Sequence, residues 1–237
     1  MMFAFARVPV FACLGFLAGV FCTVSAVGQT AQDYEAMQIE GWTVRVQDSL
    51  SDHPRRAQGL ALLQSKLAKI RKTLPGRAVR KLRQVTIWVS ENSERGAAYH
   101  PSVEWLESNG RVPEMARSVE IQNFDDFIDW SGIQPWMVLH ELAHAWHHRF
   151  LPGGYNYPVI RSAYKTAVKR GRYKRVLYYD GTKRKAYALT NEMEFFAEIT
   201  EAYFGRNDFQ PFNRRQLKGF DGDAYRMVER AWGVKGR

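Results

Sequence analysis

The stretch from Val138 to His148, VLHELAHAWHH, carries the pattern His-Glu-x-x-His within an apolar sequence. Residues four positions apart lie on one face of an α-helix, so His140 and His144 can direct both imidazoles at a single metal ion. Glu141 follows the first histidine directly, where its carboxylate can accept a proton from a water molecule on that metal. The motif therefore requires a helix whose histidine face is turned into the protein.

The flanking sequence predicts such a helix over residues 134 to 149. Ser131 can cap its start, and Pro135 suits the first turn because the nitrogen there needs no hydrogen-bond partner. A Pro-Gly-Gly sequence at residues 152 to 154 ends it. Apolar residues recur at helical spacing, which predicts that the helix is buried: Trp136, Leu139, Ala143 and Trp146.

The first residues have the organisation of a signal peptide. After Arg7 an apolar run extends over residues 8–24, and small residues then allow cleavage after Ala26 or Gly28. We therefore expect a signal peptide over residues 1–26 and an exported protein, secreted or periplasmic, with no transmembrane segment after cleavage. An uncleaved N-terminal anchor is the alternative, because the apolar run is close to membrane-spanning length.

Both cysteines, Cys13 and Cys22, fall inside this segment, so the mature chain would contain none. An exported protein without cysteine has no disulfides, and its stability depends on core packing and on any bound metal. Removing 26 of the 237 residues leaves 211, which is enough for one domain over residues 27–237.

Hydrophobic periodicity predicts strands mainly in the first half of the chain and helices in the second. The predicted strands are residues 42–46, 84–90 and 118–122, the last at a sheet edge, with irregular structure over 91–117. The predicted helices are 54–73, 134–149, 158–170, 191–204, 212–218 and 223–232, and an Asp180-Gly181 turn predicts a hairpin over 175–187. This pattern favours an α+β fold with a small sheet and a helical C-terminal half.

The chain carries a net charge of +10, and its longest basic region extends from Lys165 to Lys185. Interleaved tyrosines there would suit nucleic-acid binding. Export argues against that partner, and no nucleic-acid motif accompanies the region, so we expect no nucleic acid. An anionic polymer of the cell envelope or an acidic substrate fits better than nucleic acid, but a solvated surface without a partner is favoured over both.

A catalytic zinc site needs a third protein ligand, with water in the fourth position. His147 does not qualify, because it lies about 10 Å along the helix from His140. The zincins that use a third histidine would place it at Phe150, which excludes that pattern. A better source is a downstream helix in which Glu194 and Glu198 lie one turn apart. One carboxylate can bind the metal while the other accepts an N–H from a metal-binding imidazole.

A purely structural interpretation of these glutamates is also available. Asn191 and Glu194 have the spacing of an N-terminal capping pair, in which the carboxylate serves the helix terminus. Glu198 and Glu201 could be ordinary exposed charges. The histidine motif favours the metal role, and so does the need of a dicarboxylate face on an apolar helix for partners.

The two helices together resemble a known family. His-Glu-x-x-His followed by a helix with a ligand glutamate is the arrangement of the gluzincin metallopeptidases. Residues 187–198, YALTNEMEFFAE, are similar to the metal-ligand helix in the catalytic domain of anthrax lethal factor. The separation of 50 positions between His144 and Glu194 is similar as well. The resemblance covers about residues 134 to 204.

This resemblance implies a zincin-like fold that holds one Zn²⁺ ion. It implies that Glu194 is the third ligand, that Glu198 is the partner of a ligand imidazole, and that Tyr187 donates a hydrogen bond to the tetrahedral intermediate. Judged from its own neighbours, Tyr187 is instead a cross-strand aromatic of the predicted hairpin. Toxin activity and toxin substrates do not carry over, because this chain is too short to contain the other domains of the toxin.

The sequence therefore predicts an exported zinc-dependent metallopeptidase acting on a peptide or protein substrate. Glu141 would take a proton from the zinc-bound water that attacks the peptide bond and later pass it to the leaving amine, and Tyr187 would stabilise the oxyanion. Two alternatives remain. One is a non-catalytic, zinc-stabilised envelope or binding protein, and the other is a zinc amidase that acts on cell-wall peptides.

Overall fold

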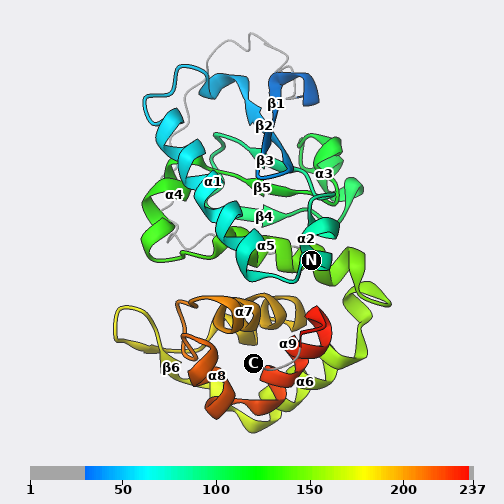
Figure 1. The fold of residues 1–237 in the computed structure, drawn as a ribbon, viewed down its shortest axis with the longest axis vertical. Helices are drawn as coiled ribbons and strands as arrows, with labels where there is room; N and C mark the ends of the chain where they lie inside the picture. The colour runs from blue at the N-terminus through cyan, green and yellow to red at the C-terminus, as the bar shows by residue number, and fades with distance from the viewer. Residues whose placement is uncertain (1–29, 235–237) are drawn as a thin grey trace, which may run out of the picture.

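The upper half of the molecule holds a five-stranded sheet with helices around it, and the lower half is mainly helical (Figure 1). The computed structural model describes residues 30–234, so the expected signal peptide and both cysteines lie outside the described residues. The architecture is α+β, as the sequence predicts. None of the described helices is long and apolar enough to cross a membrane.

The sheet has the strand order β1-β2-β3-β5-β4. Its strands are β1 (Tyr34–Ile39), β2 (Trp42–Gln47), β3 (Ile87–Val89), β4 (Ala97–Tyr99) and β5 (Val119–Ile121). β2, β3 and β5 run parallel to one another, whereas β1 and β4 are antiparallel strands at the two edges. The predicted strand at residues 118–122 exists, but its predicted edge position is wrong because β4 lies outside it.

The prediction missed both edge strands. β1 and β2 are joined by Glu40 and Gly41, whose φ angles of 54° and 87° form the tight left-handed turn that suits a two-residue hairpin. Most side chains of β1 are exposed or half-buried, so its sequence lacks a marked apolar face. β4 is only three residues long and reads Ala-Ala-Tyr, which is too short to show alternation.

The helices agree better with the sequence. They are α1 (Arg56–Thr73), α2 (Gly76–Leu82), α3 (Val103–Ser108), α4 (Phe124–Asp129), α5 (Met137–Phe150), α6 (Pro158–Arg170), α7 (Glu192–Phe204), α8 (Arg214–Phe220) and α9 (Gly222–Trp232). The six predicted helices correspond to α1 and to α5 through α9. The short α2, α3 and α4 were not predicted. The predicted hairpin is formed by β6 (Val176–Leu177) and β7 (Lys183–Arg184).

Helix α5 lies where the two halves of the molecule meet. It packs against the edge strand β4 on one side and against α7 on the other, as the order of labels in Figure 1 shows. One hydrophobic core continues through both halves, and it includes Trp42 from β2, Leu139 from α5 and Phe195 from α7. Trp146 of α5 stacks on Trp232 of α9, with ring centroids 4.8 Å apart. The motif helix is therefore buried on nearly all sides.

Candidate metal centre

His140 and His144 face the same direction from α5, as their spacing requires. Both are buried, with 5% and 8% of their surface exposed, and their ring centroids are 4.9 Å apart. α5 has no polar side chain at its N-terminus to bond the first N–H groups, since Trp136 occupies the cap position. Every residue from Met137 to His147 is buried, so tertiary packing holds this helix in place.

Glu194 enters the site from the first turn of α7. The side chain of Asn191 caps that helix, accepting hydrogen bonds from the N–H groups of Met193 and Glu194 at 2.9 and 2.8 Å. The carboxylate of Glu194 points to the histidines instead. Its Oε2 lies 3.1 Å from Nε2 of His140 and 3.4 Å from Nε2 of His144. Asn191 therefore supplies the cap, and Glu194 is directed at the imidazoles.

These three side chains form a group that could hold a metal ion. One atom from each of His140, His144 and Glu194 lies within 4.8 Å of the others, and all three residues are buried. Two neutral imidazole nitrogens and one carboxylate oxygen are the donor set of many catalytic zinc sites. The residues present thus fit the ion that the motif predicts, and the structure brings together the three ligands expected from sequence.

The electrostatics of the group agree with mutual attraction. Burial disfavours ionisation of Glu194, but His144 and His140 outweigh it and hold the pKa of this carboxyl well below its usual range. Burial likewise disfavours a charged His140, yet its contacts with Glu194 and Glu201 raise its pKa well above the usual value. A cluster of this kind binds positive charge strongly, whether the charge is a proton or a metal ion.

The second ring nitrogen of His140, Nδ1, faces away from Glu194, and the carboxylate nearest to it belongs to Glu201. Its Oε1 is 2.7 Å from Nδ1 of His140, whereas Oε1 of Glu198 is 4.0 Å from the same nitrogen. The assignment of Glu198 as the imidazole partner is therefore corrected to Glu201. Along an α-helix, a residue seven positions after Glu194 is only about 20° away from it, and one four positions after is about 40° away. Position 201 follows the direction of position 194 more closely.

Glu198 instead contacts Asn207 and lies close to the buried carboxyl groups of Asp208 and Glu201. Its Oε2 accepts a hydrogen bond from Nδ2 of Asn207 at 3.1 Å. Burial, with the charges of Asp208 and Glu201, raises the pKa of Glu198 well above its usual value. Burial also raises the pKa of Asp208 to about 7, again with a contribution from Glu201. Asn207 and Asp208 come from the segment after α7, which the sequence did not connect with the site.

Glu141 lies beside the histidines and contacts the sheet. It is 5% exposed, and the backbone N–H of Tyr99 in β4 donates a hydrogen bond to its carboxylate. Burial raises the pKa of Glu141, although the two histidines act in the opposite direction. A carboxylate held in this way is oriented by the backbone and takes up a proton more readily than an exposed one.

A buried polar network on β5 anchors the end of β4. Glu120 of β5 is fully buried and accepts from Oγ of Ser90 at 2.7 Å, and it lies 2.7 Å from Nε2 of His100, the residue after β4. Arg111 forms an ion pair with the same carboxylate. This network fixes the strand whose Tyr99 N–H orients Glu141.

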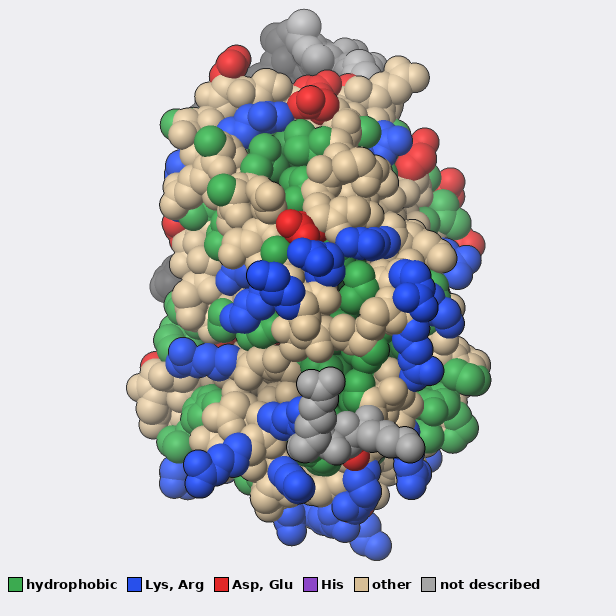
Figure 2. Space-filling view, in the orientation of Figure 1, with side chains coloured by type: hydrophobic (Ala, Val, Ile, Leu, Met, Phe, Trp, Pro, Cys, Tyr) green, Lys and Arg blue, Asp and Glu red, His purple; other side chains and the backbone are tan. Residues whose placement is uncertain are grey.

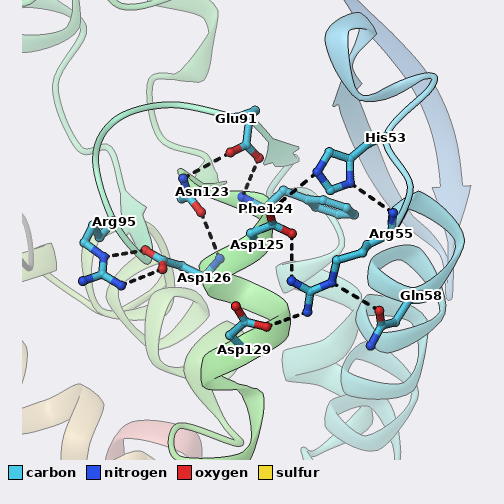
Figure 3. A network of polar contacts seen from close by, with 10 residues as sticks. All are labelled: His53, Arg55, Gln58, Glu91, Arg95, Asn123, Phe124, Asp125, Asp126 and Asp129. Atoms are coloured by element: carbon cyan, nitrogen blue, oxygen red, sulfur yellow. Dashed lines mark hydrogen bonds and ion pairs between the residues drawn. The ribbon is translucent and has the colours of Figure 1, made fainter.

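A small cavity lies beside the donor group, and of the three candidate ligands only His140 lines it. The cavity reaches from β4 to the buried carboxylates, and its lining consists of Gly96, Ala97, Trp130, Gln134, Met137, His140, Glu141, Glu198, Glu201 and Asp208. Arg95 covers Trp130, with its guanidinium 4.5 Å from the ring centroid, and makes two hydrogen bonds to Asp126 at 2.9 and 2.8 Å. Figure 3 shows this pair beside a second contact, in which Arg55 reaches Asp125 and Asp129. Of these contacts, the one between Arg95 and Asp126 touches the cavity, because Arg95 covers the lining residue Trp130.

Tyr187 lies in a short 3-10 turn directly before α7. β7 ends at Arg184, so the alternative of a cross-strand aromatic is wrong. Burial raises the pKa of Tyr187, and the charges of Glu194 and Glu141 add to the effect. The phenol therefore stays protonated and can act as a hydrogen-bond donor near both carboxylates.

Tyr155 is a second phenol near the centre that the sequence did not identify. Burial raises its pKa, with contributions from the charges of Tyr99, Glu141 and Glu194. Its ring stacks on His148, with centroids 4.8 Å apart. The chain reaches this position by reversing at the predicted Pro-Gly-Gly helix stop, where Gly153 and Gly154 have φ angles of 75° and 55°. The sequence predicts that the helix ends here, but it does not predict the direction that the chain takes afterwards.

His147 takes no part in the donor group. It is fully buried, and its ring meets those of Tyr155 and Phe196 edge-on. Burial lowers the pKa of His147 to about 3, so it is neutral. Its exclusion as a ligand on helical geometry agrees with this packing.

The chain matches no known family model, no curated protein and no solved structure. The zincin-like fold and membership of the gluzincins therefore stay predictions from the sequence.

Proposed function

We propose that this protein is a zinc metallopeptidase. The observation that carries the proposal is the convergence of His140, His144 and Glu194, whose ligand atoms lie within 4.8 Å of one another in a buried site. Glu141 stands next to this group with its carboxylate oriented by β4. Export is a part of the proposal that rests on the sequence of residues 1–26 alone.

A zinc ion in this site would supply Lewis acidity to a water molecule and to the carbonyl of the scissile bond. Glu141 would accept the proton released in the attack and return it to the leaving amine. Its raised pKa suits both transfers, because a general base works best when its pKa approaches the working pH. Tyr187 would donate a hydrogen bond to the developing oxyanion, and its own raised pKa keeps that proton in place.

The edge strand supports a peptide as the substrate. Gly96 and His100 bond to the β5 side, so in an antiparallel ladder the backbone groups of Ala97 between them face the opposite side. Ala97 lines the cavity next to Glu141. An extended peptide could add to this edge by backbone hydrogen bonds, which would bring one of its carbonyls toward the metal centre.

The decisive variant is Glu141→Gln. It preserves size and removes the proton acceptor, so we expect peptide hydrolysis to fall by about 10²- to 10⁴-fold while the protein keeps one equivalent of zinc. His144→Ala should instead lose the metal. Glu192→Gln, on α7 but outside the donor group, is the matched control and should retain both zinc and activity. Undiminished hydrolysis by Glu141→Gln would sink the proposal.

The two alternatives give different results in the same assays. A zinc-stabilised binding protein would bind the metal and melt at lower temperature after chelation, yet turn over no member of a peptide library. A cell-wall amidase would release amines from purified wall fragments and leave unfolded proteins intact. Hydrolysis of unfolded proteins, abolished by chelation and restored by zinc, is the result expected of the peptidase.

A further inference from the structure

The net positive charge of residues 30–234 lies in the second half of the chain. Residues 30–150 contain fifteen Lys or Arg and fifteen Asp or Glu, whereas residues 151–234 contain sixteen and nine, a net charge of +7. Four of those nine carboxylates are buried at the candidate metal centre: Glu194, Glu198, Glu201 and Asp208. The net positive charge on the surface of this half is therefore greater than the net charge of its sequence. Figure 2 shows Lys and Arg side chains at the lower end of the molecule, below a further group across its middle.

Part of this charge forms an ordered row on α6. Arg161, Lys165 and Lys169 are exposed and follow one another at intervals of one helical turn. They line a shallow groove together with Asn156, Ser162 and Thr166. The nearest carboxylate to Arg161 is that of Glu192, at 3.9 Å, and within residues 30–234 no ion pair involves Lys165 or Lys169.

The stability of the helix explains only Lys169, which lies in the last turn of α6, where a cation suits the helix dipole. Like charges one turn apart repel each other and weaken a helix. Other basic residues of the region expected from sequence do have internal partners, since Arg184 pairs with Asp180 and Arg172 donates to the carbonyl of Phe220. The three cations of the α6 row are exposed and regularly spaced along one face of the helix. This arrangement points to an external partner.

We propose that the α6 groove binds a linear acidic polysaccharide. Successive cations lie about 6 Å apart along the helix, a spacing at which repeated carboxylates can pair with them. The amide of Asn156 and the hydroxyls of Ser162 and Thr166 lie between or beside the cations and can hydrogen-bond sugar hydroxyls.

Other anionic partners fit this surface less well. No aromatic side chain lines the groove, so it has no platform on which a nucleic-acid base could stack. Pro158 is the one apolar residue in the lining, which leaves little to insert into a lipid surface. Hydroxyl and amide groups interleaved with cations suit a polymer that carries both carboxylates and hydroxyls.

Two lining residues of the groove lie next to residues in the neighbourhood of the candidate metal centre. Asn156 follows Tyr155, whose ring stacks on His148, and Arg161 lies near Glu192 at the start of α7. The lining of the groove and that of the central cavity share no residue. A bound polysaccharide would hold the protein in place and leave the centre accessible. The inference does not depend on the proposed peptidase activity.

Binding of polygalacturonate to the protein, measured calorimetrically at low and at physiological salt, tests this proposal. We expect saturable binding that weakens as salt rises, and no binding of neutral dextran. The double variant Lys165→Glu/Lys169→Glu should weaken binding at least tenfold. Its control, Lys72→Glu/Arg80→Glu, changes the net charge by the same amount at exposed positions of α1 and α2 and should stay within twofold of the parent.

Several results would overturn the proposal. They are absence of binding, equal weakening in the two double variants, and tighter binding of phosphatidylglycerol vesicles or of duplex DNA than of polygalacturonate. Melting curves establish that each variant is folded. Should charge reversal unfold the protein, Lys165→Gln/Lys169→Gln replaces it, with at least a threefold loss expected. Hydrolysis of an uncharged peptide should be unchanged in all of these variants, which separates a failure of this proposal from a failure of the peptidase.

Discussion

Glu201 and His140 meet on the side of the imidazole away from Glu194, with Oε1 of the glutamate 2.7 Å from Nδ1 of the histidine. An N–H on Nδ1 leaves the lone pair of Nε2 directed at the proposed metal position. A carboxylate in this role orients the ring and makes it a stronger ligand. In the proposed zinc site Glu201 would act through His140, as a positioning residue.

The first prediction concerns this contact. Glu201→Gln should weaken zinc affinity by about 10- to 100-fold, as is typical when the hydrogen-bond partner of a ligand histidine is changed. Glu198→Gln should have a smaller effect, because its nearest oxygen is 4.0 Å from the same nitrogen. Competition with a fluorescent zinc chelator measures both affinities. A greater loss in Glu198→Gln would return the role to that residue.

The second prediction concerns the two phenols. Tyr187→Phe should lower kcat by about 10²-fold, the scale of losing one oxyanion donor, and leave KM and zinc content nearly unchanged. Tyr155→Phe is the matched comparison, since it removes the second phenol near the centre while keeping the ring that stacks on His148. It should retain most of the activity. A rise in KM without a fall in kcat for Tyr187→Phe would contradict the assignment.

The third prediction is a pH dependence. Burial raises the pKa of Asp208 to about 7, from an ordinary value of 3.8. Because the folded pKa lies above the unfolded one, this group contributes its full stability below pH 3.8 and loses it as the pH rises toward 7. Asp208→Asn cannot ionise, so the free energy of unfolding of the variant should rise relative to that of the parent as the pH rises, by about 4 kcal/mol at pH 8.

Denaturant unfolding of the metal-free parent and of Asp208→Asn, at pH 4 and at pH 8, measures that difference. Comparing the two proteins removes the contribution of other titrating groups, including His140. A difference in unfolding free energy that is the same at both pH values would show that Asp208 does not titrate in this range.

The fourth prediction concerns the cap of α7. Asn191→Ala removes the acceptor for two backbone N–H groups and should cost about 1 kcal/mol of stability. It should also weaken zinc binding, because Glu194 sits in the freed turn. Asn213→Ala removes the cap of α8, whose side chain accepts from the N–H of Gln216, and has no contact with the centre. Urea unfolding should show similar losses in both variants, with zinc affinity reduced only in Asn191→Ala.

Much of this arrangement could be predicted from local sequence. The periodic apolar residues of α5, α6 and α7, and the Asn191 cap, indicated those helices within a few residues of their bounds. The His-Glu-x-x-His spacing brought His140 and His144 to one face because helical geometry is fixed. Glu194 came from a resemblance between helices, and the structure places it against both imidazoles.

What the sequence missed depends on contacts between distant segments. β4 has three residues and gains its role from pairing with β5, which no local pattern reveals. The choice of Glu201 over Glu198 depends on how α7 is rotated against α5, because both positions lie on the same side of an isolated helix. Tyr155 and Asp208 reach the centre through chain reversals, and only the packed structure shows where those reversals lead.

The position of α5 has a consequence for folding. The proposed ligands come from two segments 50 positions apart, one packed against the sheet and the other belonging to the lower helices. Separation of the halves would disperse the donors, so a bound ion closes a long loop and couples the two halves into one cooperative unit. Metal loss would then lower the barrier to opening along the α5–α7 contact, and proteolytic nicking of the apoprotein should begin there.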